Sequence, residues 1–225
     1  MTPRDADATA LIVRTGLANT ASVKAGLLRA GCAAVETEDP ADVADAARVV
    51  LPGVGSFGHG IARLEELGVA RALRERVAAG RPTLCVCLGM QLLFGASEEA
   101  PGAVGLAAAP GRAARFPATD AAGEPLRVPQ LGWNTVRVEG EPDGWAYFAN
   151  SFRVGAEHAP ALEEAGWRVG VTDYGGPFVG LLRRGGVLAC QFHPELSSVF
   201  GRRLLGGWVR SASAPAGDGA IGATP

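Results

Sequence analysis

The sequence predicts an α/β fold in which a doubly wound, mainly parallel sheet carries an added antiparallel β region. In the first half of the chain, short apolar runs alternate with helical patterns, as at residues 10–13 and 23–28, which is typical of parallel strands joined by covering helices. From residue 128 onward, short β-rich stretches are separated by Gly, Pro or Asp turns, which is typical of antiparallel strands. Loops that bind ligands are expected at the carboxyl ends of the parallel strands.

The expected elements follow these two patterns along the chain. The parallel part comprises strands at 10–13, 49–51 and 83–86 and helices at 23–28, 61–79 and 88–94. The antiparallel part comprises strands at 135–138, 145–148, 167–171, 178–182 and 187–192, and a last helix follows at 198–210. We expect one domain over residues 10–211, with a flexible N-terminus at 1–9 and a flexible tail at 212–225 that is rich in Ala, Gly and Pro.

Composition and charge exclude several classes of function. Of 225 residues, 48% are hydrophobic and 20% are charged, and the net charge of −2 provides no field that would attract nucleic acid. No apolar run approaches the roughly 18 to 20 residues of a membrane span, and the N-terminus does not resemble a signal peptide. We therefore expect a cytoplasmic protein that binds neither nucleic acid nor membrane. The four Cys and three His lack metal-ligand spacing, so no metal or other cofactor is expected.

The first candidate site is the segment at 83–91, where a buried strand is expected to run directly into a helix. Cys87 falls in the tight turn between them, the position of the nucleophile in a nucleophile elbow. The helix N-terminus favours a thiolate, and the free amide of Leu88 is expected to bind an oxyanion. The segment alone is also compatible with Cys85 and Cys87 being two core cysteines, since free Cys is often buried.

The second candidate site is Gln-Phe-His-Pro-Glu at 191–195, at the end of an apolar strand. His193 and Glu195 are two residues apart, so in an extended chain their side chains leave the same face. Glu195 is expected to fix the imidazole tautomer, and the second ring nitrogen then exchanges a proton with Cys87. A structural histidine is the alternative interpretation.

The third candidate site is the Gly-rich loop Pro-Gly-Val-Gly-Ser-Phe-Gly at 52–58, directly after a strand. Glycine permits close approach of the backbone to a ligand, and the amide of Val54 is a second candidate oxyanion donor. Alone, such a loop is also compatible with a simple turn or a phosphate cradle, but the sequence has no Walker lysine and no acidic residue placed for a dinucleotide.

Taken together, these segments resemble the class I (triad) glutamine amidotransferases over about residues 10–210. Cys-Leu-Gly-Met-Gln-Leu-Leu at 87–93 and the segment at 191–195 resemble the class in general. The loop at 52–58 and Pro-Gln-Leu-Gly-Trp-Asn at 129–134 resemble one subfamily, the glutaminase subunits of imidazole glycerol phosphate synthase in histidine biosynthesis.

The resemblance implies hydrolysis of L-glutamine through a thioester, with a triad of Cys87, His193 and Glu195. Ammonia would then pass to a separate (β/α)8 cyclase subunit in a heterodimer, which makes imidazole glycerol phosphate and an aminoimidazole carboxamide ribonucleotide. In the family, five positions bind glutamine by the Gln side chain or by the backbone; here they are Gly53, Gly55, Gln91, Ser151 and Phe152.

Several positions depart from the family pattern, mostly on the side that would face the cyclase. Gln130 and Asn150 stand where His is common, and Leu196 replaces a Lys that pairs with an acid on the cyclase. The residues expected at the partner interface are Asn19, Gln130, Trp133, Asn134 and Leu196. Departures at Arg14, where Asp is usual, Asn150 and Leu196 motivate one alternative, a catalytically silent docking module. A sister amidotransferase with another acceptor is the other alternative.

Overall fold

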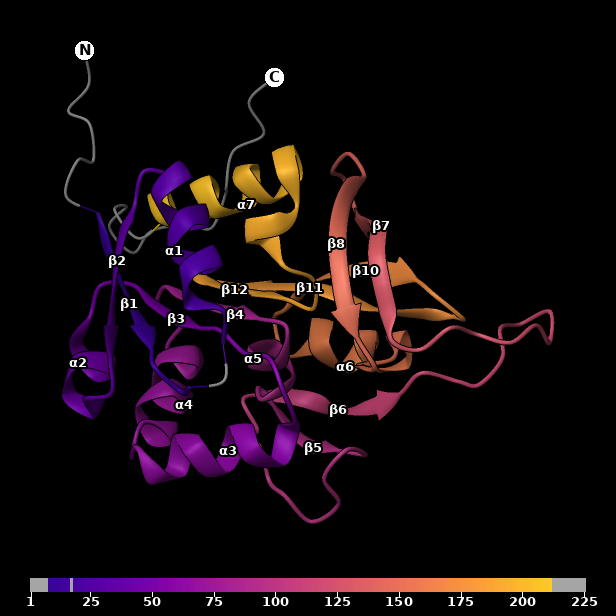
Figure 1. The fold of residues 1–225 in the computed structure, drawn as a ribbon, viewed down its shortest axis with the longest axis horizontal. Helices are drawn as coiled ribbons and strands as arrows, with labels where there is room; N and C mark the ends of the chain where they lie inside the picture. Colours follow the sequence, from indigo (N-terminus) through magenta and orange to yellow (C-terminus); the bar gives the residue numbers. More distant parts are fainter. Residues whose placement is uncertain (1–7, 17, 212–225) are drawn as a thin grey trace.

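The computed structural model describes residues 8–16 and 18–211. They form three layers, with a nine-stranded sheet between two layers of helices (Figure 1). The expected flexible segments lie outside the described residues, apart from Ala8 and Thr9. The strand order is β2-β1-β3-β4-β12-β11-β10-β7-β8. These strands are β1 (Thr9–Val13), β2 (Ala33–Thr37), β3 (Val49–Leu51), β4 (Thr83–Val86), β7 (Gln130–Val138), β8 (Gly144–Asn150), β10 (Arg168–Asp173), β11 (Pro177–Arg184) and β12 (Val187–Cys190).

The sheet combines the two expected parts. Strands β2, β1, β3, β4 and β12 pair in parallel, and the strands from β12 through β8 pair antiparallel. Because β12 pairs in parallel with β4, the chain segments that follow Val86 and Cys190 emerge at the same edge of the sheet. The sequence prediction of a mainly parallel sheet with an antiparallel extension is confirmed.

Helices cover both faces of the sheet (Figure 1). The helices α1 and α7 pack on one face, and their apolar side chains share a cluster with those of β1, β4 and β12. The other face is covered by α2, α3, α4 and α6. The helices are α1 (Thr20–Arg29), α2 (Pro40–Asp45), α3 (Phe57–Glu66), α4 (Ala70–Ala78), α5 (Leu88–Gln91), α6 (Ala159–Glu164) and α7 (Ser198–Ser211), and two 3-10 turns lie at η1 (Ala156–His158) and η2 (Pro194–Leu196). No described helix is long and apolar enough to cross a membrane.

Two expected helices were wrong in extent. The helix expected at 61–79 is divided into α3 and α4, because Gly68 adopts a φ of +70° that closes the end of α3. The helix expected at 88–94 ends at Gln91, and the chain continues into β5 (Phe94–Ser97). The backbone amides of Leu106 and Ala108 bind the carbonyls of Leu92 and Leu93, which occupies the acceptors that further helical turns would use.

A small second sheet follows α5 beside the large one. It contains β5, β6 (Ala109–Arg115) and β9 (Phe152–Arg153), in the order β5-β6-β9. The β9 strand comes directly after β8, and its pairing with β6 holds the backbone at residues 152–153. Ser151 and Phe152 line the same cavity as Cys87, which follows β4. The position of the small sheet explains how residues far apart in sequence surround one cavity.

Candidate active site

Cys87 lies in a sharp turn between β4 and α5, with φ of 53° and ψ of −111°. A residue other than glycine rarely has a positive φ, and such strain is usually retained at functional sites. Close packing imposes the turn: a Cβ atom on Gly89 would lie 2.1 Å from the Leu51 carbonyl oxygen. The Cys87 amide donates to the Cys190 carbonyl at 2.7 Å, which ties the turn to the end of β12.

Cys87 and Cys85 have different environments although both are buried. Cys85 is inside the apolar core, and burial raises the pKa of its thiol to about 12. Cys87 instead lines a cavity together with His193, whose pKa it helps to raise, and its Sγ donates to the Ala149 carbonyl at 3.9 Å. The interpretation of both residues as inert core cysteines therefore fits Cys85 only.

His193 is held between Cys87 and Glu195. Its Nδ1 donates to Glu195 Oε1 at 2.9 Å, which leaves Nε2 as the ring nitrogen for Cys87. Burial of the imidazole acts to lower the pKa of His193, but its hydrogen bonds to Cys87 and Glu195 and the charges of these two groups raise the pKa to about 10. The ring therefore carries a proton at neutral pH.

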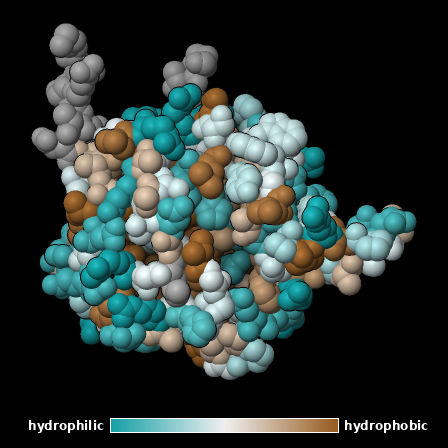
Figure 2. Space-filling model, in the orientation of Figure 1, coloured by the Kyte–Doolittle hydropathy of each residue, from teal (hydrophilic) through white to brown (hydrophobic). Residues whose placement is uncertain are grey.

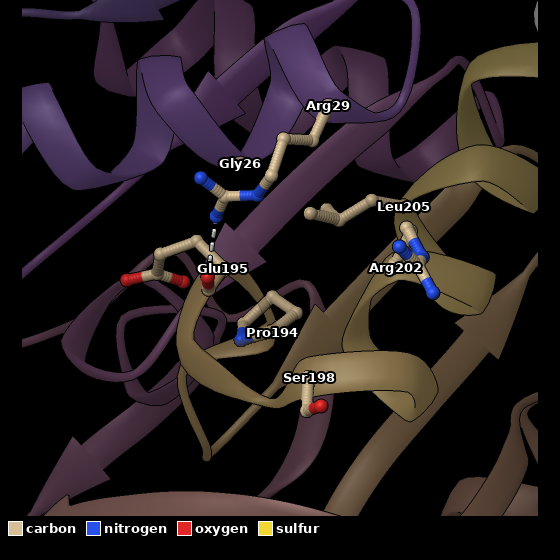
Figure 3. Close-up of a pocket in the computed structure, with 7 residues that line it drawn as sticks. All are labelled: Gly26, Arg29, Pro194, Glu195, Ser198, Arg202 and Leu205. Carbon is tan, nitrogen blue, oxygen red and sulfur yellow. Dashed lines mark hydrogen bonds between the residues drawn. The ribbon is translucent and has the colours of Figure 1, made fainter.

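The turn that carries Glu195 is held from behind by α1 (Figure 3). Arg29 Nη2 donates to the Glu195 carbonyl at 2.9 Å, as the dashed line in Figure 3 shows. A Cβ on Gly26 would lie 2.6 Å from Glu195 Cβ, so glycine is required for this approach. On the other side, the His193 amide donates to Tyr147 O at 2.9 Å. These two hydrogen bonds hold the backbone at His193 and at Glu195.

One cavity of about 320 Å³ collects most of the expected site residues. It is lined by Val54, Gly55, Cys87, Leu88, Gln91, Glu99, Pro129, Leu131, Ala149, Asn150, Ser151, Phe152 and His193. Gly53 is packed behind it, where a Cβ would lie 2.8 Å from Leu88 Cβ. Glu195 stands behind His193. Within the described residues, no group of three His, Cys, Asp or Glu side chains is arranged to hold a metal ion.

The Leu88 amide, one of the two expected oxyanion donors, is not free in this conformation. The Leu88 amide donates to the Gly53 carbonyl at 3.3 Å, so the expectation that it is free was wrong. The carbonyl and the amide of a trans peptide point in opposite directions. The Val54 amide, which belongs to the same peptide as the Gly53 carbonyl, therefore points away from Leu88. The Gly53 carbonyl of the loop thus occupies the first amide of α5.

Sequence reasoning missed Glu99 and gave Gln191 no role. Glu99 lines the cavity, and its Oε2 accepts from the Phe57 amide at 2.7 Å. No local pattern distinguishes Glu99 from other loop carboxylates. Gln191 is fully buried and donates to Cys87 Sγ at 3.8 Å. Its place next to the His-Pro-Glu segment was the available signal.

The expected interface residues divide into exposed and buried positions. Trp133 and Leu196 are 51% and 45% exposed, and Asn19 is exposed. Asn134 is half-buried and donates to the Asp173 carbonyl. Gln130 is only 2% exposed, so its assignment to a partner surface was wrong. It lies on the inner face of β7, and strand alternation places Trp133 on the outer face.

The exposed face of the β7–β8 hairpin is aromatic. Trp133 contacts Tyr147 edge to face with ring centroids 6.0 Å apart, and Trp145 is 61% exposed. In Figure 2 the surface over the upper part of this hairpin is pale, the colour of residues of intermediate hydropathy such as tryptophan and tyrosine. Leu131 and Ala149 of the same two strands line the cavity, so this face is continuous with the candidate active site.

The pKa of His193 gives a prediction that can be measured without substrate. Because its pKa is raised, His193 keeps its proton at pH values well above the ordinary histidine pKa of about 6.5. The ring should therefore titrate near pH 10 in an NMR pH titration. Cys87→Ala removes one cause of the increase, and we expect the midpoint to move down. His59 and His158, at other places in the chain, are internal controls. An unchanged midpoint in Cys87→Ala would contradict the Cys87–His193 contact.

Comparisons with known proteins agree with this geometry. A family model described as "Glutamine amidotransferase class-I" matches residues 5–205. The chain is similar to "Imidazole glycerol phosphate synthase subunit HisH" of Symbiobacterium thermophilum, with 41% identity over 89% of this chain and 92% of the relative. It is also similar to the protein of that name from Deinococcus radiodurans, with 38% identity over 93% of this chain and 96% of the relative.

Solved structures share the fold at low sequence identity. A structure described as "Crystal structure of glutamine amidotransferase" has a TM-score of 0.69 and 23% identity, and covers 91% of this chain and 99% of its own. The glutaminase domain of CTPS from Trypanosoma brucei, with bound acivicin, has a TM-score of 0.66 and 16% identity over 92% of this chain and 94% of its own. These two likenesses concern the fold alone.

Proposed function

Because the chain belongs to the class I glutamine amidotransferase family, we propose that it hydrolyses L-glutamine and supplies the ammonia to the cyclase subunit of an imidazole glycerol phosphate synthase. The relatives from Symbiobacterium thermophilum and Deinococcus radiodurans are named as HisH subunits of that synthase, and the alignments cover most of both chains. The observation that supports glutamine hydrolysis is the arrangement of Cys87, His193 and Glu195 at one cavity. The cytoplasmic location expected from the sequence stays a prediction.

In the proposed reaction, Cys87 and His193 react as a thiolate and an imidazolium. The Cys87 sulfur attacks the side-chain carboxamide carbon of glutamine and forms a tetrahedral intermediate. When the carbon–nitrogen bond breaks, His193 donates its proton to the departing nitrogen, and ammonia leaves from a glutamyl thioester. Water, deprotonated by His193, then attacks the thioester and releases glutamate and the Cys87 thiolate. Glu195 keeps Nδ1 protonated, so that Nε2 faces the sulfur.

The cavity has groups suited to an amino acid. The Glu99 carboxylate at its wall supplies a negative charge for the α-ammonium group of glutamine. The Gln91 side chain and the backbone at Gly55, Ser151 and Phe152 line the same space, and Gly53 permits the close packing of the loop against α5. We assign these positions to the binding of glutamine.

Activity requires the loop at 52–55 to change conformation. Rotation of the Gly53–Val54 peptide would remove the carbonyl from the Leu88 amide and turn the Val54 amide toward the oxyanion. Glycines at 53 and 55 flank Val54 and allow this rotation at low steric cost. We propose that docking of the cyclase favours the rotated form, so that glutamine is hydrolysed slowly by the free chain and faster in the complex.

The test is release of glutamate and ammonia from L-glutamine by the purified chain, alone and with its cyclase subunit. We expect turnover that rises on complex formation. A complex that forms without turnover would identify a silent docking module. Turnover that no histidine-pathway cyclase stimulates would indicate an amidotransferase with another acceptor.

Trp133 gives a prediction for the partner surface. Trp133→Ala should weaken binding of the cyclase, measured by calorimetry, by about tenfold or more, because half-exposed tryptophans often dominate interfaces. Its side chain does not line the cavity, so alkylation of Cys87 in the free chain should be unchanged. Leu28→Ala, which removes an exposed apolar side chain near the end of α1, is the control. Equal affinity for Trp133→Ala and the unmodified chain would exclude Trp133 from the interface.

A further inference from the structure

Gln191 occupies the turn between β12 and His193, and both ends of its side chain are used. The residue is 0% exposed, and its backbone amide donates to the Gly180 carbonyl of β11 at 2.9 Å. Its Oε1 accepts from Gln91 Nε2 at 2.9 Å, and its Nε2 donates to Cys87 Sγ at 3.8 Å. Gln191 therefore connects a wall of the cavity to the sulfur atom.

A backbone carbonyl sets the direction of this hydrogen-bond chain. The Phe152 carbonyl can only accept, so the side chain that meets it must present its NH2 group. Gln91 Nε2 donates to Phe152 O at 3.0 Å, and the same nitrogen donates to Gln191 Oε1. Once Gln191 presents its oxygen to Gln91, only its NH2 group remains for Cys87. The series of hydrogen bonds thus ends with an N–H group of Gln191 that donates to the Cys87 sulfur, which favours the thiolate as acceptor.

The same series of hydrogen bonds determines which polar atom of Gln91 faces the cavity. Both hydrogens of its NH2 group are used inside the protein, by Phe152 and Gln191. The free polar atom of Gln91 is its Oε1, an acceptor. An acceptor at this wall suits an N–H donor of the substrate, whereas a rotated Gln91 amide would present hydrogens instead. The Phe152 carbonyl sets this orientation of Gln91, and the acceptor oxygen of Gln191 holds the same NH2 group from a second side.

We propose that Gln191 is a positioning residue of the active site, which holds the Cys87 sulfur by an N–H donor and fixes the Gln91 amide with its oxygen toward glutamine. This inference rests on the proposed function for its substrate, but the contact with the sulfur can be tested without substrate. The N–H···S interaction is strongest while the sulfur is a thiolate, and it weakens in the neutral thioester. Gln191 therefore stabilises the thiolate both before the attack and when thioester hydrolysis expels it.

Two variants separate the two contacts. Gln191→Met keeps a side chain of similar length but removes both hydrogen bonds. Gln191→Glu keeps an acceptor for Gln91 and replaces the donor next to Cys87 with a carboxylate. The matched control is Gln130→Met, because Gln130 is also a buried glutamine, at 2% exposure, and it does not line the cavity.

The first measurement is the pH dependence of Cys87 alkylation by iodoacetamide in the free chain, with the modified residue identified by mass spectrometry. We expect the midpoint to rise by about one pH unit in Gln191→Met and further in Gln191→Glu, where a second negative charge faces the thiolate. Gln130→Met should match the unmodified chain. A loss of packing alone would lower the melting temperature without moving this midpoint. Midpoints unchanged in both Gln191 variants would overturn the proposal.

The second measurement is the steady-state hydrolysis of glutamine in the complex with the cyclase. Gln191→Met should raise KM about tenfold and lower kcat, since it releases both Gln91 and the sulfur. Gln191→Glu should lower kcat with KM within about twofold of the unmodified complex, since Gln91 stays oriented. An equal rise in KM for both variants would overturn the assignment of Gln91 orientation to Gln191. If the unmodified complex releases no ammonia, the proposed function fails, and the alkylation midpoints still decide the contact with the sulfur.

Discussion

Cys87→Ala is expected to abolish the release of ammonia from glutamine, with a loss of at least about 10⁴-fold in turnover by the complex. Removal of a nucleophile leaves only the contributions of binding and of the oxyanion donors. The alanine methyl group occupies the same turn, whose positive φ is imposed by the packing of Gly89 against Leu51. The variant should therefore fold and bind the cyclase. Glutamate formation in a coupled assay measures the loss.

Two controls make this prediction specific. Cys85→Ala removes a neighbouring thiol of β4 that is completely buried and does not line the cavity, so the complex should remain active. With ammonium salts in place of glutamine, the Cys87→Ala complex should support the cyclase reaction at the normal rate, because that chemistry belongs to the other subunit. Glutamine-dependent turnover that persists in Cys87→Ala would show that the nucleophile is misassigned.

Local patterns in the sequence are sufficient to predict the turn at Cys87 and the position of His193 at a strand end. Each depends on a short segment: a buried strand that runs into a helix, and an apolar strand followed by His-Pro-Glu. The proximity of the two segments is a property of the sheet. The β11–β12 hairpin places β12 next to β4, and no local pattern in either strand specifies that neighbour.

Other features were missed because tertiary contacts override local signals. The chain leaves the helical path after Gln91 because the segment at 106–108 supplies amides to the carbonyls of residues 92 and 93. The strand β2 was not predicted, since its sequence Ala-Ala-Val-Glu-Thr has little β-rich character, and only its pairing with β1 makes it a strand. The Leu88 amide is occupied by the Gly53 carbonyl. This contact depends on the conformation of a Gly-rich loop, and the loop's sequence is compatible with several peptide orientations.

The burial of Gln130 was predictable from the sequence, although it was not predicted. Gln130 and Trp133 are separated by an odd number of positions on one strand, so their side chains leave opposite faces. If Trp133 faces a partner, Gln130 faces the interior. In the ladder, Gln130 is directly opposite Asn150. The two positions at which this chain replaces a common histidine of the family are therefore neighbours across the β7–β8 hairpin.

The loop at 52–55 limits what the free chain can do. With the Gly53 carbonyl on the Leu88 amide at 3.3 Å, a tetrahedral oxyanion would meet a carbonyl oxygen instead of two amide hydrogens. Removal of one oxyanion donor in other enzymes costs about 10² to 10³ in kcat. A resting chain with neither donor in place is therefore expected to hydrolyse glutamine slowly even with its triad assembled, in line with the proposed activation by the cyclase.

His193→Asn is expected to reduce glutamine turnover by the complex by on the order of 10³-fold or more. An asparagine amide neither accepts nor donates a proton at neutral pH, so the departing ammonia loses its acid and the attacking water loses its base. The Cys87 sulfur also loses the cation that faces it, since His193 carries a proton up to a pKa of about 10. Single-turnover release of ammonia and the rate of Cys87 alkylation at pH 7 measure the two effects separately.

The substitution His158→Asn provides the matched control, because His158 lies in η1 and does not line the cavity. Both rates should fall in His193→Asn, and neither should change in His158→Asn. The ammonia release should fall further than the alkylation rate, since alkylation needs only a reactive sulfur whereas hydrolysis also needs a proton at the leaving nitrogen. If ammonia release and alkylation fell by the same factor, His193 would serve only to activate the sulfur, and another group would have to protonate the ammonia.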